Sequence, residues 1–269
     1  MKKLLLVICM LSVSSMCWAQ APSLGSAASF AILGSSTVTC TGASAITGDV
    51  GVSPGTAITG FNPDCTLTGT LHPGDGVAFQ AHLDAELANF ALSNLLALPC
   101  IQNFGPGDTP LAGLNLSPGV YCFASSASLN GTLNLTGAGP WIFRIGSTLI
   151  TGGTVPAPAS VLVNGQPNCN GLDVFWQVGS SATIGVNTQF VGNILAVQSI
   201  GLDPGAKLDG RALALGAAVT LSGSNTVSNV CGSGAGAGGG DRDDNHGCKI
   251  DNDDRDKDKD REKEKDKGR

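Results

Sequence analysis

The sequence predicts a mainly β protein whose chain winds into a three-sided coil, a β-solenoid, with one long α-helix packed along a side. Two observations predict this fold. Between Phe175 and Val227 the chain repeats itself with a step of about 18 residues, and a short fixed period of this kind is typical of a solenoid. Between Asp75 and Leu98 the apolar residues recur at helical spacing instead. Because each turn of a solenoid is covered only by its neighbours, the fold should present flat faces rather than a pocket.

The repeat contains three strand-sized pieces per period, which is why the coil should have three faces. The first piece recurs at 175–178, 193–196 and 211–214. The second recurs at 181–184, 199–202 and, one residue late, 218–221. The third recurs at 188–192 and 206–210. Residues 141–147 are similar to 174–180, and 24–71 alternate short apolar runs with turns, so we expect both stretches to belong to the same coil.

The helical segment from Asp75 to Leu98 is rich in alanine and leucine and contains no proline. Asp75 is a suitable N-cap, and Pro99 should end the helix. About 24 residues give a helix of roughly 36 Å, which has to lie along another part of the protein. The solenoid face that carries 193–197 and 211–215 is the most continuously apolar, so we expect the helix there. The predicted packing stripe consists of Phe79, Leu83, Leu87, Phe90 or Ala91, Leu95 and Leu98.

The two ends of the chain differ from the body. Residues 1–19 combine two lysines, an apolar run and small residues up to Ala19, which predicts a cleaved secretory signal peptide and an extracellular or periplasmic protein. No later stretch is long and apolar enough to span a membrane. Residues 232–269 are a glycine-rich linker followed by a tail with twelve acids and ten bases, which should be disordered. The folded domain should therefore occupy residues 20–231.

The body carries little charge, which excludes several function classes. Nine acidic and three basic residues lie between 22 and 231, so a basic surface for nucleic acid is excluded. Only His72, His82 and His246 could supply imidazole chemistry, and no cluster of carboxylates or nucleophile motif accompanies them. No cysteine or histidine spacing typical of a metal site occurs. We therefore expect neither an enzyme nor a bound cofactor or metal.

Seven cysteines remain once the predicted signal peptide is removed. In an exported chain they indicate disulfides, although spacing does not determine which cysteines pair. Cys248 in the tail would be left over. The pairs that proximity makes plausible are Cys40 with Cys65, Cys100 with Cys122, and Cys169 with Cys231.

Several motifs in the body are those of a known family. They run in order from about residue 24 to 228: FAIL at 30–33, TGDVGVSPGT at 47–56, LSPGVY at 116–121, WIFRIGSTL at 141–149, VFWQVGS at 174–180, FVGNILA at 190–196 and GRALA at 210–214. With these motifs the chain resembles the microbial ice-binding (antifreeze) proteins. The resemblance implies a right-handed, discontinuous β-solenoid of triangular cross-section with one long helix packed on a face. It also implies a flat face of threonines and small residues that adsorbs to ice and inhibits ice growth and recrystallisation.

Physical chemistry supports such a face independently of the resemblance. Neighbouring coils are about 4.7–4.9 Å apart, and β-branched threonines on a sheet are stiff, so methyl and hydroxyl groups recur at fixed intervals. Threonine and serine are also ordinary strand residues that make a surface soluble. A long cation such as Lys207 would disturb a flat face, so either Lys207 lies at the edge or the face that carries it is not the active one. The candidate ice-binding residues are Thr183, Asn187, Thr188, Ser199, Thr220, Ser222, Thr226, Thr37, Thr39, Thr56 and Thr59.

The predicted partner is thus the surface of an ice crystal. We expect the protein to be a monomer that neither binds nucleic acid nor spans a membrane. The alternative function is a non-catalytic exported adhesin or structural surface module, which would use the same rigid faces. An enzyme is disfavoured by the missing catalytic clusters.

Overall fold

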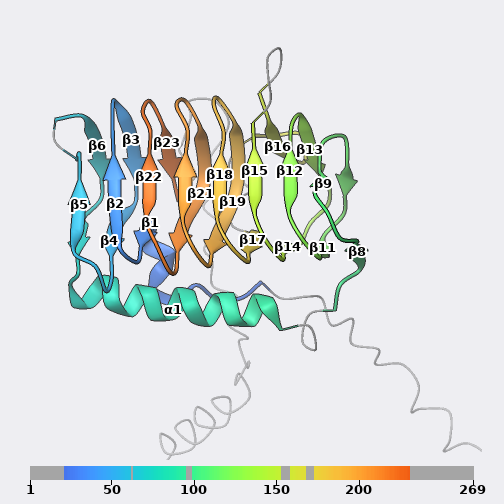
Figure 1. Ribbon diagram of the computed structural model, residues 1–269, viewed down its shortest axis with the longest axis horizontal. Helices are drawn as coiled ribbons and strands as arrows, with labels where there is room; N and C mark the ends of the chain where they lie inside the picture. Colours follow the sequence, from blue (N-terminus) through green and yellow to red (C-terminus); the bar gives the residue numbers. More distant parts are fainter. Residues whose placement is uncertain (1–20, 62, 95–98, 153–157, 168–172, 231–269) are drawn as a thin grey trace, which may run out of the picture. The chain divides into compact units, whose positions relative to one another are not determined.

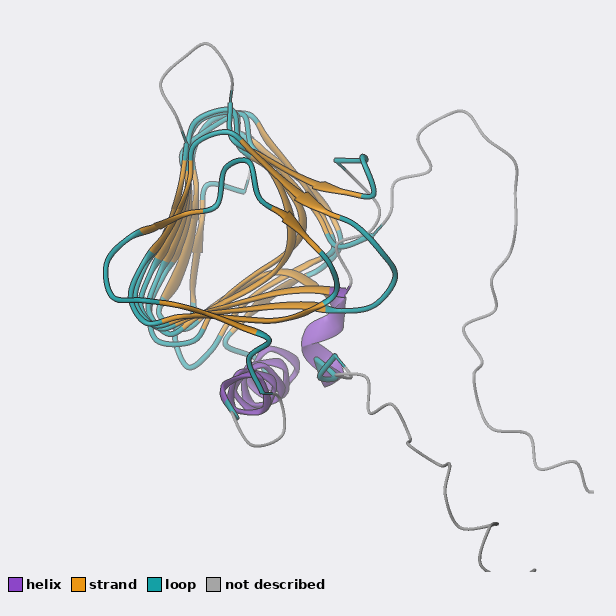
Figure 2. Cartoon of the chain, turned by 90° about the vertical axis from the view of Figure 1, so that its right-hand side faces the viewer, coloured by secondary structure: helices purple, strands orange, loops and turns teal. Residues whose placement is uncertain are grey.

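The computed structural model describes residues 21–61, 63–94, 99–152, 158–167 and 173–230. These residues form a parallel β-solenoid with a helix along one side (Figure 1). Seen along the coil, the strands enclose a triangle and the helix lies outside one of its sides (Figure 2). The predicted fold class is therefore confirmed. The predicted signal peptide, the linker and tail, and Cys169, Cys231 and Cys248 lie outside the described residues.

The first side of the triangle is the helix face, on which the helix packs. Its neighbouring strands are, in spatial order, β7 (Leu71–Pro73), β4 (Asp49–Val52), β1 (Phe30–Gly34), the second halves of β21 (Lys207–Ala214) and β19 (Gln189–Ala196), β17 (Val174–Val178), β14 (Trp141–Ile145), β11 (Gly119–Phe123) and β8 (Gln102–Phe104).

We call the second side the threonine face. It is a separate sheet of eight strands in the order β5 (Ala57–Thr59), β2 (Thr37–Cys40), β22 (Val219–Leu221), β20 (Ile200–Leu202), β18 (Ala182–Ile184), β15 (Leu149–Thr151), β12 (Ala127–Leu129) and β9 (Thr109–Pro110).

We call the third side the mixed face, because both charged and hydroxyl side chains project from it. Its strands are β6 (Cys65–Thr68), β3 (Ser44–Thr47), β23 (Thr226–Ser228), the first halves of β21 and β19, β16 (Ser160–Val163), β13 (Thr132–Leu135) and β10 (Asn115–Leu116).

The strand registers confirm the sequence repeat. Phe175 lies beside Asn193, which in turn lies beside Arg211. The one-residue slip is real as well, because Ile200 lies beside Val219. The inward side chains stack from coil to coil, and the rings of Phe143 and Trp176 lie 4.0 Å apart between their centroids. The coil interior is thus one continuous apolar column.

The coils do not follow one another in chain order, so the solenoid is discontinuous. Strand β1 lies between β4 and β21, with Ile32 beside both Val50 and Ala212. The first coils of the chain therefore extend the solenoid beyond its last coil. Strands β7 and β8 end up at opposite ends of the helix face, and α1 (Gly76–Ser93) carries the chain between them (Figure 1).

The helix begins where the sequence predicts and ends earlier. The carboxylate of Asp75 accepts a hydrogen bond from the backbone N–H of Ala78 at 2.8 Å, which makes Asp75 the N-cap. Helix α1 ends at Ser93, with Asn94 as its C-cap, rather than at Leu98. Residues 95–98, and with them Leu95 and Leu98 of the predicted stripe, lie outside the described residues.

The helix packs on the predicted face of the solenoid, but the side of the helix that packs is opposite to the predicted one. It buries a narrow row of small residues, chiefly Ala78, Ala81, Ala85 and Ala88, whereas the predicted stripe points to solvent. The reason lies in the sheet, which supplies the bulk of this interface itself. Large side chains already project from the helix face, so along most of α1 a close approach admits only small side chains, with Leu92 and His82 as the larger buried exceptions. They are Phe30, Leu33, Val120, Ile142, Phe175, Leu195 and Leu213.

Two buried arginines fasten the helix and the N-terminal segment to the solenoid. Arg144 donates from Nε to the carbonyl of Leu92 and from Nη2 to that of Asn94, at 2.9 Å for the second, so it binds the C-terminal end of α1. Arg211 donates to the carbonyl of Ala28, at 2.9 Å from Nε and 2.7 Å from Nη2. Burial lowers the pKa of both guanidinium groups.

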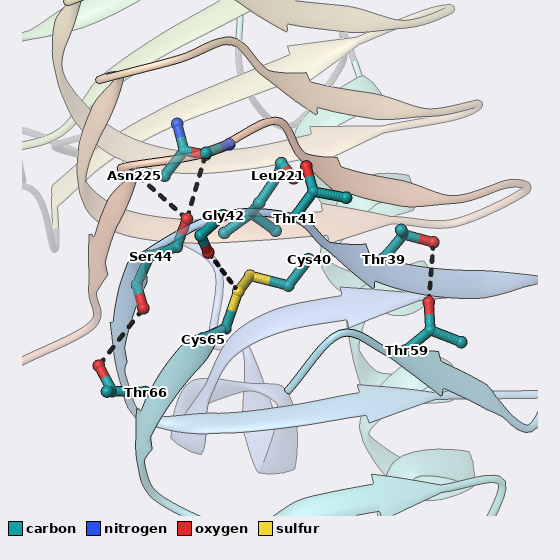
Figure 3. The surroundings of a disulfide bond; sticks show 11 residues. Thr39, Cys40, Thr41, Gly42, Ser44, Thr59, Cys65, Thr66, Leu221 and Asn225 are labelled. Atoms are coloured by element: carbon teal, nitrogen blue, oxygen red, sulfur yellow. Dashed lines mark hydrogen bonds between the residues drawn. A yellow bond between two sulfur atoms is a disulfide. The ribbon is translucent and has the colours of Figure 1, made fainter. Parts of the chain in front are cut away.

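The described residues form two disulfides, both between cysteines that proximity in sequence favours. Cys40 pairs with Cys65 (Figure 3), and Cys100 pairs with Cys122. The first links β2 to β6 in the coil at one end of the solenoid, and the second links Cys100, two residues before β8, to β11 at the other end. Each disulfide thus fixes an end coil, which has a neighbour on one side only.

Candidate functional site

The middle residues of the strands on the threonine face form a straight row. In β22, for example, Val219 and Leu221 are buried in the core, whereas Thr220 between them is exposed. The strand register places equivalent residues side by side across the whole face. From one end to the other, the row is Thr59, Thr39, Thr220, Gly201, Thr183, Ile150, Ser128 and Pro110.

A second row lies two residues earlier on each strand, about 7 Å away. Its hydroxyls are paired between coils: Ser181 with Ser199 at 3.0 Å between the Oγ atoms, and Ser126 with Thr148 at 2.8 Å. In the first row, the Thr59 hydroxyl likewise donates to that of Thr39 at 3.4 Å (Figure 3). These hydrogen bonds hold the hydroxyls in fixed orientations. The second row consists of Ala57, Thr37, Ala218, Ser199, Ser181, Thr148 and Ser126.

No residue of these two rows carries a charge. The nearest carboxylate at the far end is Asp108, just before β9, which accepts a hydrogen bond from the Ser128 hydroxyl at 2.5 Å. Asp203 lies at the ends of the strands, in the turn after β20. The surface between β5 and β12 is therefore neutral, and its side chains are short except for Ile150.

The mixed face has a different character. Lys207, Asp209 and Gln189 project from its central strands. Beside them, the surface is hollowed by a cavity of about 440 Å³, whose rim includes Pro167 and Val230. The mixed face is thus neither neutral nor flat over its central part. Lys207 lies in the centre of this face and not on the threonine face. Of the two alternatives that the sequence left open, Lys207 is therefore not at the edge of the threonine face.

The structure brings most of the candidate residues together on the threonine face or at its border. Thr56 precedes β5 and Ser222 follows β22, so both lie at the border, and both are exposed. Asn187 lies in the corner turn between β18 and β19, with a positive φ of 56°. The candidates within the two rows are Thr37, Thr39, Thr59, Thr183, Ser199 and Thr220.

Two candidates do not fit this surface. Thr188 has no exposed area, and its hydroxyl accepts a hydrogen bond from that of Thr151 at 3.2 Å, so it satisfies a buried corner of the coil instead of meeting solvent. Thr226 is exposed, but it lies on the mixed face beside Lys207. The repeat places both residues in the coil without indicating which way a corner residue turns.

Sequence reasoning also missed residues of the two rows. Most of them lie on or just before β9, β12 and β15, beyond the insertion that interrupts the repeat before Phe175. The similarity of 141–147 to 174–180 was the signal that could have extended the rows, because Trp141 lies beside Val174 and fixes the register of the following strands. The missed residues are Ala57, Pro110, Ser126, Ser128, Thr148, Ile150, Ser181, Gly201 and Ala218.

Two carboxylates at and on helix α1, those of Asp75 and Asp84, serve structural contacts. Asp75 accepts from His72 Nδ1 at 2.8 Å as well as from Ala78, and these hydrogen bonds lower its pKa. The Asp84 carboxylate accepts from both the hydroxyl and the backbone N–H of Ser26, which lowers its pKa. Among the described residues, no group of three or more His, Cys, Asp or Glu is placed to hold a metal ion. Within the same segments, no helix is long and apolar enough to cross a membrane.

A stiff, neutral sheet face with two regular rows is suited to contact with another extended surface, which makes this chain a surface-binding β-solenoid. A family profile described as "Ice-binding-like" matches residues 32–228. The chain belongs to this family.

Individual members of the family are similar to this chain over most of its length. The chain is 47% identical over 214 residues to an ice-binding protein of Nostoc sp. (strain HG1), and the match covers 77% of this chain and 74% of the relative. It is 30% identical over 217 residues to an ice-binding protein of Flavobacterium frigoris (strain PS1), covering 76% and 75%. The crystal structure of an ice-binding protein from the Antarctic ascomycete Antarctomyces psychrotrophicus is similar with a TM-score of 0.68 and 39% identity, covering 78% of this chain and 98% of the other.

Proposed function

We propose that the protein is a secreted ice-binding protein that adsorbs to ice through the threonine face. The observation that carries this proposal is the pair of neutral, parallel rows across seven consecutive strands, β5 to β12. The names of the relatives favour ice over the alternative, a non-catalytic adhesin or structural module. We assign the protein no catalytic role, and the predicted signal peptide supports its export.

The geometry of the rows explains how adsorption would work. Methyl groups and hydroxyls recur at the coil spacing of about 4.7–4.9 Å along each row. The apolar parts order the adjacent water, and the hydroxyls hydrogen-bond to it. Because the threonines are stiff and many hydroxyls are already paired, little side-chain entropy is lost when this water joins the crystal. The bound protein then pins the ice front, which curves between molecules and stops growing until the temperature falls further.

The choice between the two open faces rests on charge and shape. An ionised side chain holds a strongly oriented hydration shell that does not match the ice lattice. The mixed face carries Lys207 and Asp209 in its centre, next to the 440 Å³ cavity. The two rows of the threonine face carry no charged side chain between β5 and β12. We therefore assign ice contact to the threonine face.

Thermal hysteresis and inhibition of ice recrystallisation test the proposal on the mature protein. The parent should show both activities, and Thr220→Tyr should lose most of its hysteresis because the ring stands above the flat row. Thr226→Tyr is the matched control, since it makes the same exchange on the exposed mixed face, and it should retain the parent's activity. A parent without either activity refutes ice binding. Equal loss in both variants, or loss only with Thr226→Tyr, refutes the assignment to the threonine face.

A further inference from the structure

The largest apolar side chains on α1 point away from the protein. Phe79 is 56% exposed, Leu83 37%, Leu87 66% and Phe90 70%. All four lie on the side of the helix opposite the alanines that pack on the solenoid. We call these four residues the outer stripe. Scattered apolar residues on a surface are ordinary, but a continuous row of two phenylalanines and two leucines is a candidate interaction surface.

The outer stripe is large enough to matter for association. At about 200 Å² for a phenylalanine, the exposed parts of Phe79 and Phe90 leave roughly 250 Å² of aromatic surface in water. The two leucines bring the patch to about 400 Å², within the range of functional apolar patches on monomers. Two such patches together with their rims come to roughly 1,000–1,200 Å², the lower limit of a specific interface. An association through this stripe alone would therefore be weak.

The residue types of the outer stripe follow nearly the same order in both directions along the helix. The residues follow one another at intervals of four, four and three, so the series phenylalanine, leucine, leucine, phenylalanine occurs in both directions along the helix. A twofold axis perpendicular to α1 near Asp84 and Ala85 would place Phe79 against the partner's Phe90 and Leu83 against the partner's Leu87. Such reciprocal contacts are the requirement of an isologous dimer.

We propose that two copies of this protein associate through the outer stripe as an antiparallel, twofold-symmetric dimer. A second copy is the occupant that the chain's composition favours. The composition of residues 241–269, with twelve acids, ten bases and Ile250 as the single large apolar residue, offers no apolar complement to the stripe.

The charges on α1 do not oppose this pairing. Helix α1 contains no lysine or arginine, and its two carboxylates have neighbours within the chain. Asp84 binds Ser26, and Glu86 lies 3.5 Å from His82. The dimer replaces the monomer expected from the sequence. It does not depend on ice binding, because α1 covers the helix face and leaves the threonine face open.

Sedimentation equilibrium of the mature protein from about 1 µM to 500 µM tests the proposal, because a weak interface should dissociate in the micromolar range. The average mass should rise from one chain towards two as the concentration increases. Leu87→Glu should weaken the association at least tenfold while leaving the circular dichroism spectrum unchanged, since the side chain is exposed. Val77→Glu is the control, because Val77 is an exposed apolar residue outside the stripe, and it should associate like the parent.

A charge pair tests the antiparallel register. Leu83→Lys alone should also weaken the association, whereas Leu83→Lys combined with Leu87→Glu should restore it, because each cation then faces a carboxylate of the partner. A parent that stays monomeric at every concentration overturns the proposal, and so does a dimer that Leu87→Glu leaves intact. A dimer that both single changes dissociate and the double change does not restore overturns the antiparallel register. Thermal hysteresis per chain should be equal in the parent and Leu87→Glu.

Discussion

The threonine face and the mixed face are formed by the same coils, yet only one of them is neutral and flat. On the threonine face, a turn of chain contributes a three-residue strand with a short side chain between two buried ones. On the mixed face, β21 contributes Lys207 and Asp209, and the neighbouring loop and C-terminal residues form the rim of a cavity. The difference shows that the solenoid supplies regular spacing to every face, whereas the side chains decide which face can adsorb. Regular spacing is thus a property of the whole fold, whereas the neutral surface that the proposed adsorption requires is a property of one face.

The largest difference between the two faces is expected when a positive charge is placed on the threonine face or removed from the mixed face. Thr183→Lys places a long cation in the centre of the threonine face and should lower thermal hysteresis at least tenfold, because a hydrated ammonium group disturbs the ordered water around it. Lys207→Thr, the reverse exchange on the mixed face, should leave hysteresis unchanged. Both variants should melt within a few degrees of the parent, since both positions face solvent. Equal effects of the two exchanges would contradict the difference between the faces.

Filling the gap in the first row should sharpen the comparison. Gly201 lies between Thr220 and Thr183, has no side chain, and a Cβ atom added there would meet nothing within 4 Å. Gly201→Thr should therefore fit, complete the row and raise hysteresis about twofold, because a stiff β-branched side chain then continues the spacing. Gly201→Lys serves as the control and should lower hysteresis. A Gly201→Thr variant that is less active than the parent would show that the gap itself contributes to ice contact.

A smaller gain is expected at the end of the threonine face. Asp108 holds the Ser128 hydroxyl through a charged hydrogen bond at the last strand of the face. Asp108→Asn keeps an acceptor at this position without the charge, so recrystallisation inhibition should rise slightly, by less than the gain at Gly201. Asp173→Asn, an exposed change before β17 on the helix-face sheet, should have no effect. Unchanged activity in Asp108→Asn would mean that this end of the face does not contact ice, and a loss of activity would mean that the carboxylate itself contributes to the contact.

The smallest effect is expected from a change in pH, which should alter the melting temperature but not thermal hysteresis. Hydrogen bonds lower the pKa of Asp75 and Asp84 below the usual 3.8, so the folded state binds fewer protons than the unfolded state near that pH. Their contribution is complete above about pH 4 and is lost as the pH falls through the lowered pKa values. The melting temperature should therefore fall below pH 4, less steeply in Asp84→Asn. Hysteresis should stay constant from pH 5 to 9 because the two rows do not titrate; a change in this range would implicate a charged group.

The sequence predicts much of this fold because the period of the sequence repeat also sets the register in which neighbouring strands pair. Residues one period apart, such as Phe175, Asn193 and Arg211, lie on adjacent strands, so a match in the sequence becomes a contact in space. The helix shows where this reasoning stops. Helical spacing identifies an apolar stripe, but it does not reveal that the opposite sheet has already filled the interface with side chains such as Phe30 and Leu213.

The candidate site was predicted only in part, for a related reason. The period assigns Thr188 to a coil, but its orientation depends on Thr151, which lies on a coil beyond the insertion. Thr220 and Thr226 are close in sequence and equally exposed in pattern, yet the corner between β22 and β23 separates them onto different faces. A one-dimensional pattern identifies residues that point outward, whereas the position of the corners determines which surface they share.

The insertion of β1 between β4 and β21 has a consequence for how the protein acquires its structure. The Thr41 hydroxyl donates to the carbonyl of Leu221, 180 positions away, at 3.0 Å. Contacts this distant in sequence slow folding, because a long loop must close before they form. The first coils emerge first during synthesis and translocation, but the strands they pair with are among the last. We therefore expect the N-terminal coils to remain unpaired until the chain is nearly complete, so that the protein folds late and as a whole.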